Sequence, residues 1–320
     1  MNQPTTPCFL VYASRSGSTY LGSLLDCYDD IGVSLESLFI YYLLNGPDRY
    51  STKSEIDGAL DYFYEDDRSR EWDLDRDQLT LSLEKVLPLT PPELLHEVLG
   101  ADFGKRKPSA KIYLFKGCSS RFMHLLVKRF PDTKVVFVYR DGRAVYASQK
   151  KSRVPYASRV HSTNPIITAR GWVRWFQVID DITANGASVM QVKYEDMIGE
   201  VEEVVPAVHR FLTGNTGPDT PVNFETKKYS RRIPSAQSDI HQNVESPPLK
   251  SRIDGWRTEL PDYEIKSFEK VAGPMLIAHD YEFSAKSRGA ALLKNWLFDS
   301  KYRAELVFEA LRAKFSRIFP

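Results

Sequence analysis

Residues 14–19, SRSGST, have the residue types of an anion-binding turn. An apolar run that predicts a strand ends just before them, and a helix-period pattern begins just after them. The first backbone N–H groups of a helix have no intrahelical partner and carry partial positive charge. Gly17 lets the backbone approach a phosphate closely, the hydroxyls of Ser18 and Thr19 are donors, and Arg15 adds positive charge. The turn therefore predicts a phosphate cradle, with an ordinary strand-to-helix turn capped by a serine as the alternative.

The turn is not a Walker A loop, which reads GxxxxGK[ST]. No lysine precedes Ser18, and Arg15 stands two residues before the glycine. In a Walker kinase the lysine bridges the outer phosphates, and the Ser or Thr holds magnesium. A nucleotide kinase or another P-loop phosphotransferase is therefore a second candidate rather than the first.

A second candidate phosphate site lies in residues 134–153, KVVFVYRDGRAVYASQKKSR. Arg140 ends an apolar run that predicts a buried strand, and Ser148 follows eight residues later on a predicted helix over residues 142–151. Such a helix can bring Ser148 back beside the strand end, where an arginine fork and a hydroxyl clamp a phosphate. The alternative is a solvated basic helix, because Arg143 and further cations lie on the same segment.

The elements that must position these residues alternate along the chain. Helix-period stretches cover residues 121–130, 142–151 and 169–184, and short apolar runs predict buried strands at residues 9–13, 112–115, 135–139 and 189–192. This alternation predicts an α/β fold with a central parallel sheet flanked by helices. Ligands in such folds bind at the carboxyl ends of the strands, where both candidate phosphate sites lie.

Two segments depart from this pattern within a main domain that we expect over residues 1–285. Residues 36–110 are rich in Tyr, Asp and Pro, with helical fragments at 38–44, 56–64 and 92–100. They predict an insertion packed over the sheet edge, suited to acceptor recognition. Residues 214–250 are polar and contain prolines, which predicts a long surface loop.

The tail, residues 286–320, predicts a basic amphipathic C-terminal helix. Its apolar residues recur at helical spacing, and its basic residues outnumber its acidic ones. Such a helix could contact a membrane surface peripherally or a second copy of the chain in a homodimer. Packing on its own domain is the alternative.

The composition is typical of a soluble globular protein. The 320 residues are 42% hydrophobic and 27% charged, with a net charge of +1. The overall electrostatic field of the protein therefore gives no reason to expect nucleic-acid binding. The three cysteines form no CxxC pair and are expected to be reduced core thiols. The chain shows no signal peptide and no run near the ~20 apolar residues of a membrane span. We therefore expect a cytoplasmic protein with no nucleic-acid partner, and no metal site, since its six histidines show no HExxH pairing.

The two phosphate sites together resemble the motifs of sulfotransferases that use 3′-phosphoadenosine 5′-phosphosulfate (PAPS). SRSGSTYL, residues 14–21, is similar to their 5′-phosphosulfate loop, and YRDGRAVYAS, residues 139–148, to their 3′-phosphate motif. KYEDM, residues 193–197, resembles the segment whose tyrosine lies near the adenine. LKSRIDGWR, residues 249–257, resembles a weaker form of the loop that closes over the nucleotide. The resemblance spans residues 8–282 and implies a P-loop-NTPase-like sulfotransferase fold of the bacterial or carbohydrate type.

The resemblance implies a function and a set of nucleotide contacts. The protein would transfer a sulfuryl group from PAPS to a hydroxyl, or secondarily an amine, of a small-molecule, glycan or lipid acceptor, without a metal. A non-catalytic protein that binds PAPS or its product remains an alternative. The implied nucleotide-binding residues are Arg15, Ser16, Gly17, Ser18, Thr19, Arg140, Ser148, Tyr194, Lys250 and Arg252.

The general base is the open part of the resemblance. Aryl and steroid sulfotransferases carry Lys-Thr-His after the second strand, whereas this chain keeps Lys116 but has Cys118 at the histidine position, and a thiol is a poor base. Carbohydrate-type relatives use a glutamate shortly after the first helix, a position that Glu36 occupies here. The implied catalytic residues are therefore Glu36, Lys116 and Arg15. Alternatively, Glu36 is only a favourable charge at a helix N-terminus, with His124 as a rival base.

Overall fold

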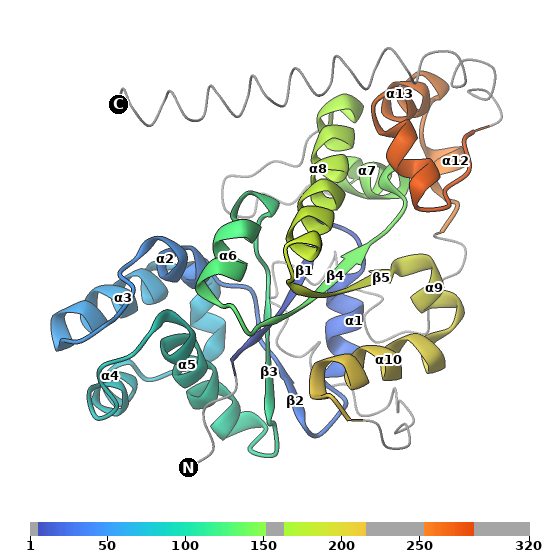
Figure 1. Cartoon of the computed structure of the whole chain (residues 1–320). Helices are drawn as coiled ribbons and strands as arrows, with labels where there is room; N and C mark the ends of the chain where they lie inside the picture. Colours follow the sequence, from blue (N-terminus) through green and yellow to red (C-terminus); the bar gives the residue numbers. More distant parts are fainter. Residues whose placement is uncertain (1–5, 152–162, 216–252, 285–320) are drawn as a thin grey trace, which may run out of the picture.

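A parallel sheet forms the centre of the computed structural model, which describes residues 6–151, 163–215 and 253–284 of the chain (Figure 1). Its strand order is β2-β3-β1-β4-β5, and every neighbouring pair is parallel. The strands are β1 (Cys8–Tyr12), β2 (Ile31–Val33), β3 (Ile112–Lys116), β4 (Lys134–Tyr139) and β5 (Ser188–Lys193). Since β1 lies in the middle, its carboxyl end is flanked by the carboxyl ends of β3 and β4.

The four predicted strands are confirmed, each within one residue of its predicted bounds. Strand β2 is not predicted by the sequence pattern, because three residues with a glycine in the middle give little hydrophobic signal. Gly32 lies against helix α5 (Pro91–Arg106), where a Cβ atom would come within 2.7 Å of the Phe103 ring. The glycine that weakens the strand signal is therefore what lets the helix approach the sheet.

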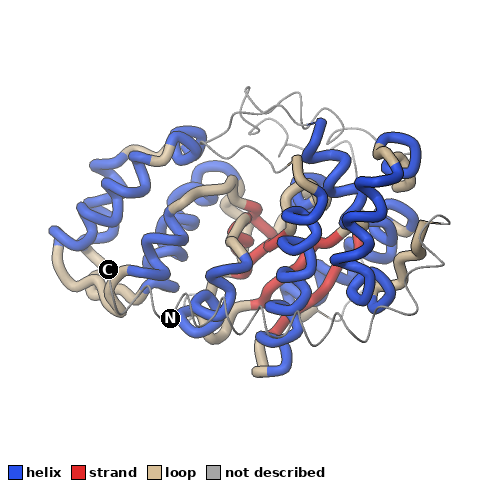
Figure 2. The backbone as a smooth tube through the Cα atoms, turned by 90° about the horizontal axis from the view of Figure 1, so that it is seen from above, coloured by secondary structure: helices blue, strands red, loops and turns tan. Residues whose placement is uncertain are grey.

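One face of the sheet packs against α5, α6 (Met123–Arg129) and α8 (Pro165–Ala184) (Figures 1 and 2). The Phe9 ring in β1 lies 5.2 Å from Phe130, which follows α6. Phe137 in β4, on the same face, lies 5.4 Å from Trp175 in α8. Helix α8 begins four residues before its predicted start because Asn164 caps it, accepting hydrogen bonds from the first free backbone N–H groups.

The other face packs against α1 (Ser18–Leu25) and α10 (Val201–Thr213). Tyr28, just after α1, stacks on His209 of α10 with ring centroids 4.1 Å apart. His209 also contacts Asp30 at 2.9 Å, which ties α10 to the segment that enters β2. The prediction of a parallel sheet flanked by helices is thus confirmed.

Residues 36–110 form a helical layer at the β2–β3 edge. It consists of α2 (Phe39–Asn45), α3 (Lys53–Glu65), the 3-10 helix η1 (Asp67–Trp72), α4 (Arg76–Glu84) and α5. The ring centroid of Trp72 lies 6.4 Å from that of Phe115 in β3 and 5.6 Å from that of Phe63 in α3. The helical fragments predicted in this segment are present, and large aromatic residues such as Phe39 and Phe63 belong to the core.

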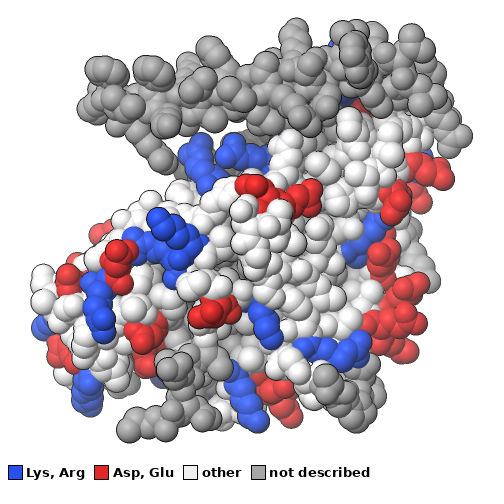
Figure 3. All heavy atoms as spheres, viewed as in Figure 1, with Lys and Arg blue, Asp and Glu red and all other residues white. Residues whose placement is uncertain are grey.

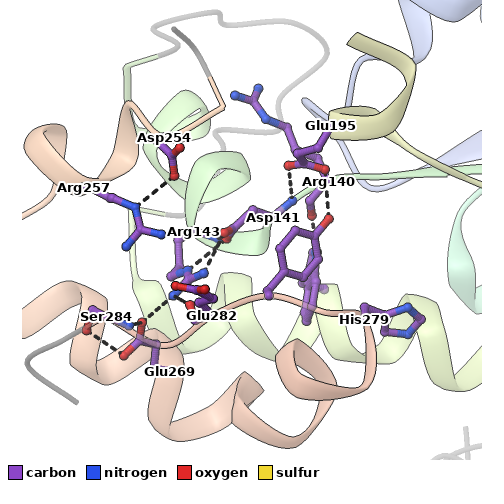
Figure 4. Close-up of polar contacts among 12 residues, drawn as sticks. Arg140, Asp141, Arg143, Glu195, Asp254, Arg257, Glu269, His279, Glu282 and Ser284 are labelled. Atoms are coloured by element: carbon purple, nitrogen blue, oxygen red, sulfur yellow. Dashed lines mark hydrogen bonds and ion pairs between the residues drawn. The ribbon is translucent and has the colours of Figure 1, made fainter. Parts of the chain in front are cut away.

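A buried ion cluster joins α7 (Gly142–Lys151) to the C-terminal helices α12 (Trp256–Glu259) and α13 (Asp262–Ala278) (Figure 4). The side chain of Arg143 is 1% exposed and pairs with Asp141 at 2.7 Å and Glu269 at 2.5 Å. Its guanidinium also lies 3.9 Å from the Trp256 ring centroid. The alternative of a solvated basic helix is therefore wrong, because the single arginine of α7 lies in the core.

The same cluster reaches the end of β4 through α9 (Tyr194–Gly199). Glu195 accepts hydrogen bonds from the Asp141 N–H and the Tyr281 hydroxyl, both at 3.0 Å (Figure 4). Burial raises the pKa of the Glu195 carboxyl. These contacts fix the backbone that immediately follows Arg140.

Several predicted features lie outside the described residues. They are Lys250, Arg252, the tail over residues 286–320, and the 214–250 loop beyond its first two residues. Within the described residues no helix is long and apolar enough to cross a membrane, and no three His, Cys, Asp or Glu side chains are grouped to hold a metal ion. On the face in Figure 3, basic and acidic side chains are interspersed.

We predict that Arg143→Ala destabilises the protein by about 3–5 kcal/mol, because it leaves two buried carboxylates without their cation. Chemical denaturation measures this change in the free energy of unfolding. The matched control is Arg76→Ala, which removes an exposed pair with Asp61 and is expected to cost less than about 1 kcal/mol. Equal effects of the two variants would contradict the role of Arg143.

Candidate active site

The loop between β1 and α1 has a backbone conformation that ordinary residues rarely adopt. Arg15 has a φ of 74° and Gly17 a φ of 90°, both in the left-handed region. A non-glycine residue held there costs on the order of 1–3 kcal/mol, so the surrounding contacts must impose it. Helix α1 starts directly after Gly17, with Ser18 and Thr19 in its first turn. The loop thus directs the free N–H groups of the helix toward the carboxyl end of β1.

Tyr194, the first residue of α9, packs directly on this loop. A Cβ atom at Gly17 would come within 2.3 Å of the Tyr194 ring, so any other residue would displace that ring and strain the backbone. The guanidinium of Arg140 lies 4.5 Å from the centroid of the same ring. The aromatic side chain is therefore held between the two predicted phosphate sites.

A side-chain hydrogen bond also joins the two sites. The Arg15 Nε donates to Ser148 Oγ at 3.0 Å, across 133 residues of sequence. Helix α7 has the bounds predicted for it, and it returns Ser148 to the end of the sheet as expected. The two predicted phosphate sites therefore lie side by side.

The loop holds a buried hydroxyl that no described residue satisfies. Ser16 is fully buried, and its Oγ has no hydrogen-bond partner within the described part of the chain. Ser18 and Thr19 are also buried, at 5% and 8% exposure. A buried polar atom without a partner is costly, so a bound oxyanion fits this loop well.

Lys116, the last residue of β3, connects the loop to the predicted base. Its Nζ donates to Thr19 Oγ1 at 2.9 Å and lies 3.3 Å from Glu36 Oε1. Its side chain is 6% exposed, and its ammonium lies 5.6 Å from the centroid of the Tyr12 ring. The buried Lys116 ammonium thus contacts both the β1–α1 loop, which we call the anion loop, and the Glu36 carboxylate.

Glu36 follows β2 in a loop and retains access to solvent, with 40% of its side chain exposed. Partial burial of the Glu36 carboxyl disfavours its charged form and so raises its pKa. The Lys116 ammonium and the hydrogen bond from the Tyr12 hydroxyl outweigh this effect, and the pKa of Glu36 is lowered. Arg68 of η1 acts in the same direction. The carboxylate is therefore ionised at neutral pH.

The loop that carries Glu36 is held by the helical layer. Asp66 accepts the Leu38 N–H at 2.6 Å and the Ser37 hydroxyl at 3.2 Å. Helix α2 begins only at Phe39 and has no acidic residue in its first turn. The alternative that Glu36 serves as an N-terminal helix charge is therefore wrong, because its charge faces Lys116 instead.

Comparison with known proteins agrees with this geometry. The model of the sulfotransferase family matches residues 7–215. The chain belongs to the sulfotransferase family. A comparison with curated protein sequences found no significant match.

Solved structures of sulfotransferase domains share the fold. The sulfotransferase domain from the curacin biosynthetic pathway aligns with a TM-score of 0.58 at 16% identity, covering 88% of this chain and 100% of that one. The sulfotransferase domain of the Synechococcus PCC 7002 olefin synthase aligns with a TM-score of 0.50 at 19% identity, covering 88% of this chain and 98% of that one. The predicted P-loop-like sulfotransferase fold is confirmed.

The position of the histidine found in aryl sulfotransferases is not suited to proton transfer here. Cys118 is buried, and burial raises the pKa of its thiol to about 12. The rival His124 lies on α6 with 55% of its side chain exposed, where it faces Asp181 at 3.4 Å. Neither side chain has a contact with the β1–α1 loop among those that the structure describes.

Sequence reasoning missed three residues around the site. Tyr12 ends a strand that reads as uniformly apolar, and its hydroxyl is the only signal of a polar role. Asp66 and Arg68 lie in an irregular segment about 30 residues from Glu36 in sequence, so no spacing rule connects them to it. The partners of Glu36 become visible only when β1, β3 and η1 are brought together.

We predict that Lys116→Met raises the pKa of the Glu36 carboxyl, because it removes the cation and leaves burial as the dominant influence. NMR titration of glutamate side-chain carbons in labelled protein measures this. The matched control is Lys134→Met, since Lys134 Nζ donates to the Leu212 carbonyl elsewhere in the fold. A Glu36 pKa that stays the same in both variants would disprove the electrostatic coupling.

Proposed function

We propose that this sulfotransferase transfers a sulfuryl group from PAPS to a hydroxyl group of a small-molecule, glycan or lipid acceptor. The observation that carries the proposal is the position of Lys116. Its ammonium contacts both Thr19 of the anion loop and the Glu36 carboxylate. One cation thus stands between the place for a leaving phosphate and a group that can accept a proton.

The polar surface supports a nucleotide with anions at both ends. The unsatisfied Ser16 hydroxyl, the first N–H groups of α1 and Thr19 suit the 5′ end. Arg140 and Ser148 suit the 3′-phosphate, since a guanidinium matches phosphate geometry. Arg15 belongs to the 5′ loop, and its hydrogen bond to Ser148 Oγ links that loop to the 3′ site. Tyr194 offers an aromatic ring beside both.

The residues have distinct roles in the transfer. A bond forms between the acceptor oxygen and sulfur, the bridging sulfur–oxygen bond breaks, and its electron pair leaves on the 5′-phosphate. Lys116 and the backbone N–H groups stabilise that developing charge. Glu36 takes the acceptor's proton.

The position of the Glu36 carboxylate beside Lys116 favours an enzyme over a protein that only binds the nucleotide. A binding protein has no need of a carboxylate beside the transferring group. The lowered pKa keeps Glu36 charged at neutral pH and so able to accept a proton, although it also weakens the base. Its partial exposure leaves the carboxylate reachable by an acceptor.

We predict that the protein binds 3′-phosphoadenosine 5′-phosphate, the desulfated product of PAPS, and does not bind ATP with magnesium. Isothermal titration calorimetry with both ligands measures this. A charge-assisted hydrogen bond contributes about 1.5–3 kcal/mol, so Arg140→Ala is expected to weaken product binding roughly 10- to 150-fold. Adenosine 5′-phosphate, which lacks the 3′-phosphate, is the control and should bind both proteins alike. Preference for ATP would favour a phosphotransferase instead.

We predict that Glu36→Gln lowers kcat by about 10²–10⁴-fold while the affinity for 3′-phosphoadenosine 5′-phosphate stays within a few-fold, because it removes the base and keeps the shape of the side chain. An acceptor screen with PAPS supplies the assay. Glu93→Gln is a control, since Glu93 caps α5 through Thr90. Unchanged turnover in the Glu36 variant would remove this residue from the mechanism.

A further inference from the structure

We propose that Tyr12 is a positioning residue that holds the Glu36 carboxylate so that Oε2, rather than Oε1, takes the proton of the acceptor. This inference rests on the proposed role of Glu36 as the general base. It assigns a task to a residue at the end of β1 that the sulfotransfer chemistry itself does not use.

The two oxygens of Glu36 have different surroundings. Oε1 accepts the hydrogen bond of the Tyr12 hydroxyl and also lies 3.3 Å from Lys116 Nζ. Oε2 accepts no hydrogen bond within residues 6–151, 163–215 and 253–284. The Glu36 side chain is 40% exposed, and Oε2 is the oxygen at which an approaching acceptor hydroxyl displaces no hydrogen bond.

Rigid parts of the fold hold both partners of this hydrogen bond. Tyr12 belongs to β1, which is paired on both sides, with β3 and β4. Glu36 lies in the loop that Asp66 fixes through Leu38 and Ser37. The geometry of the carboxylate is therefore set before any acceptor binds, which is what an efficient base requires.

The turn after β3 passes directly beside the pair. Gly117 has a φ of 106°, and a Cβ atom there would lie 3.7 Å from both the Glu36 Cγ and the Tyr12 hydroxyl. The backbone of this turn therefore packs against the side chains of Tyr12 and Glu36.

The charged and titratable groups around Glu36 come from three elements. Tyr12 ends β1, Lys116 ends β3, and Arg68 lies in η1. All three favour the ionised carboxylate. Loss of the Tyr12 hydroxyl removes one of them, so the pKa of Glu36 rises and the base becomes protonated at a higher pH than before.

The test is Tyr12→Phe, which removes only the hydroxyl. We expect the acid limb of the pH profile of kcat/KM to move to higher pH, and kcat above that limb to fall about tenfold, a part of the roughly 10²–10⁴-fold that a positioned base supplies. The affinity for 3′-phosphoadenosine 5′-phosphate should not change. Tyr64→Phe is the matched control, because the Tyr64 hydroxyl donates to the Leu74 carbonyl at 3.0 Å in the helical layer.

The Glu36→Gln variant makes it possible to test the role of Tyr12 separately from the role of Glu36 as the base. If Tyr12 acts through Glu36, adding Tyr12→Phe to Glu36→Gln causes no further loss of kcat. If Glu36→Gln alone keeps full turnover, the base assignment fails and this inference with it. If Glu36→Gln loses activity while Tyr12→Phe keeps the wild-type acid limb and kcat, only the role of Tyr12 is overturned. NMR titration of Glu36 in folded Tyr12→Phe protein gives an independent reading, and an unchanged pKa would likewise overturn it.

Discussion

The buried ammonium of Lys116 is the interaction on which the rest of the site depends. Removing a cation from water costs several kcal/mol unless its charge and hydrogen bonds are matched. Here the Thr19 hydroxyl and the Glu36 carboxylate supply that match. The three residues come from α1, β3 and the loop after β2, so the pairing fixes the relative positions of the β1–α1 loop and Glu36. In the mechanism proposed above, the same charge also stabilises the leaving phosphate.

A second buried cation, Arg143, supports the end of β4, where the sequence predicts the 3′-phosphate site. Arg143 sits between Asp141 and Glu269, while the Arg140 carbonyl accepts the Trp172 indole N–H at 2.9 Å. The backbone at the end of β4 is therefore held by α7, α8 and α13 together, as Figure 4 shows for the ion cluster. Arg140 itself is buried, at 8% exposure, and this support orients its guanidinium for the phosphate contact proposed above.

The electrostatics of Glu36 reflect a compromise between charge and reactivity. Lys116, Tyr12 and Arg68 keep the carboxylate ionised, which a base requires, but they also reduce its affinity for a proton. Both donors act on one oxygen and leave the other open. In the proposed mechanism, this arrangement keeps Glu36 charged and leaves Oε2 for the proton transfer.

The sequence alone determined the parallel sheet, the turn at residues 14–19, and the positions of Arg140, Ser148 and Tyr194, because hydrophobic periodicity and short motifs are local properties of the chain. It also placed Lys116 and Glu36 as candidates. Only the tertiary structure decided what these residues touch. The burial of Arg143, the Tyr194 ring on Gly17, and the hydrogen bond of Tyr12 to Glu36 all join segments that are distant in sequence. Such contacts depend on how whole elements pack, and a local pattern carries no record of that packing.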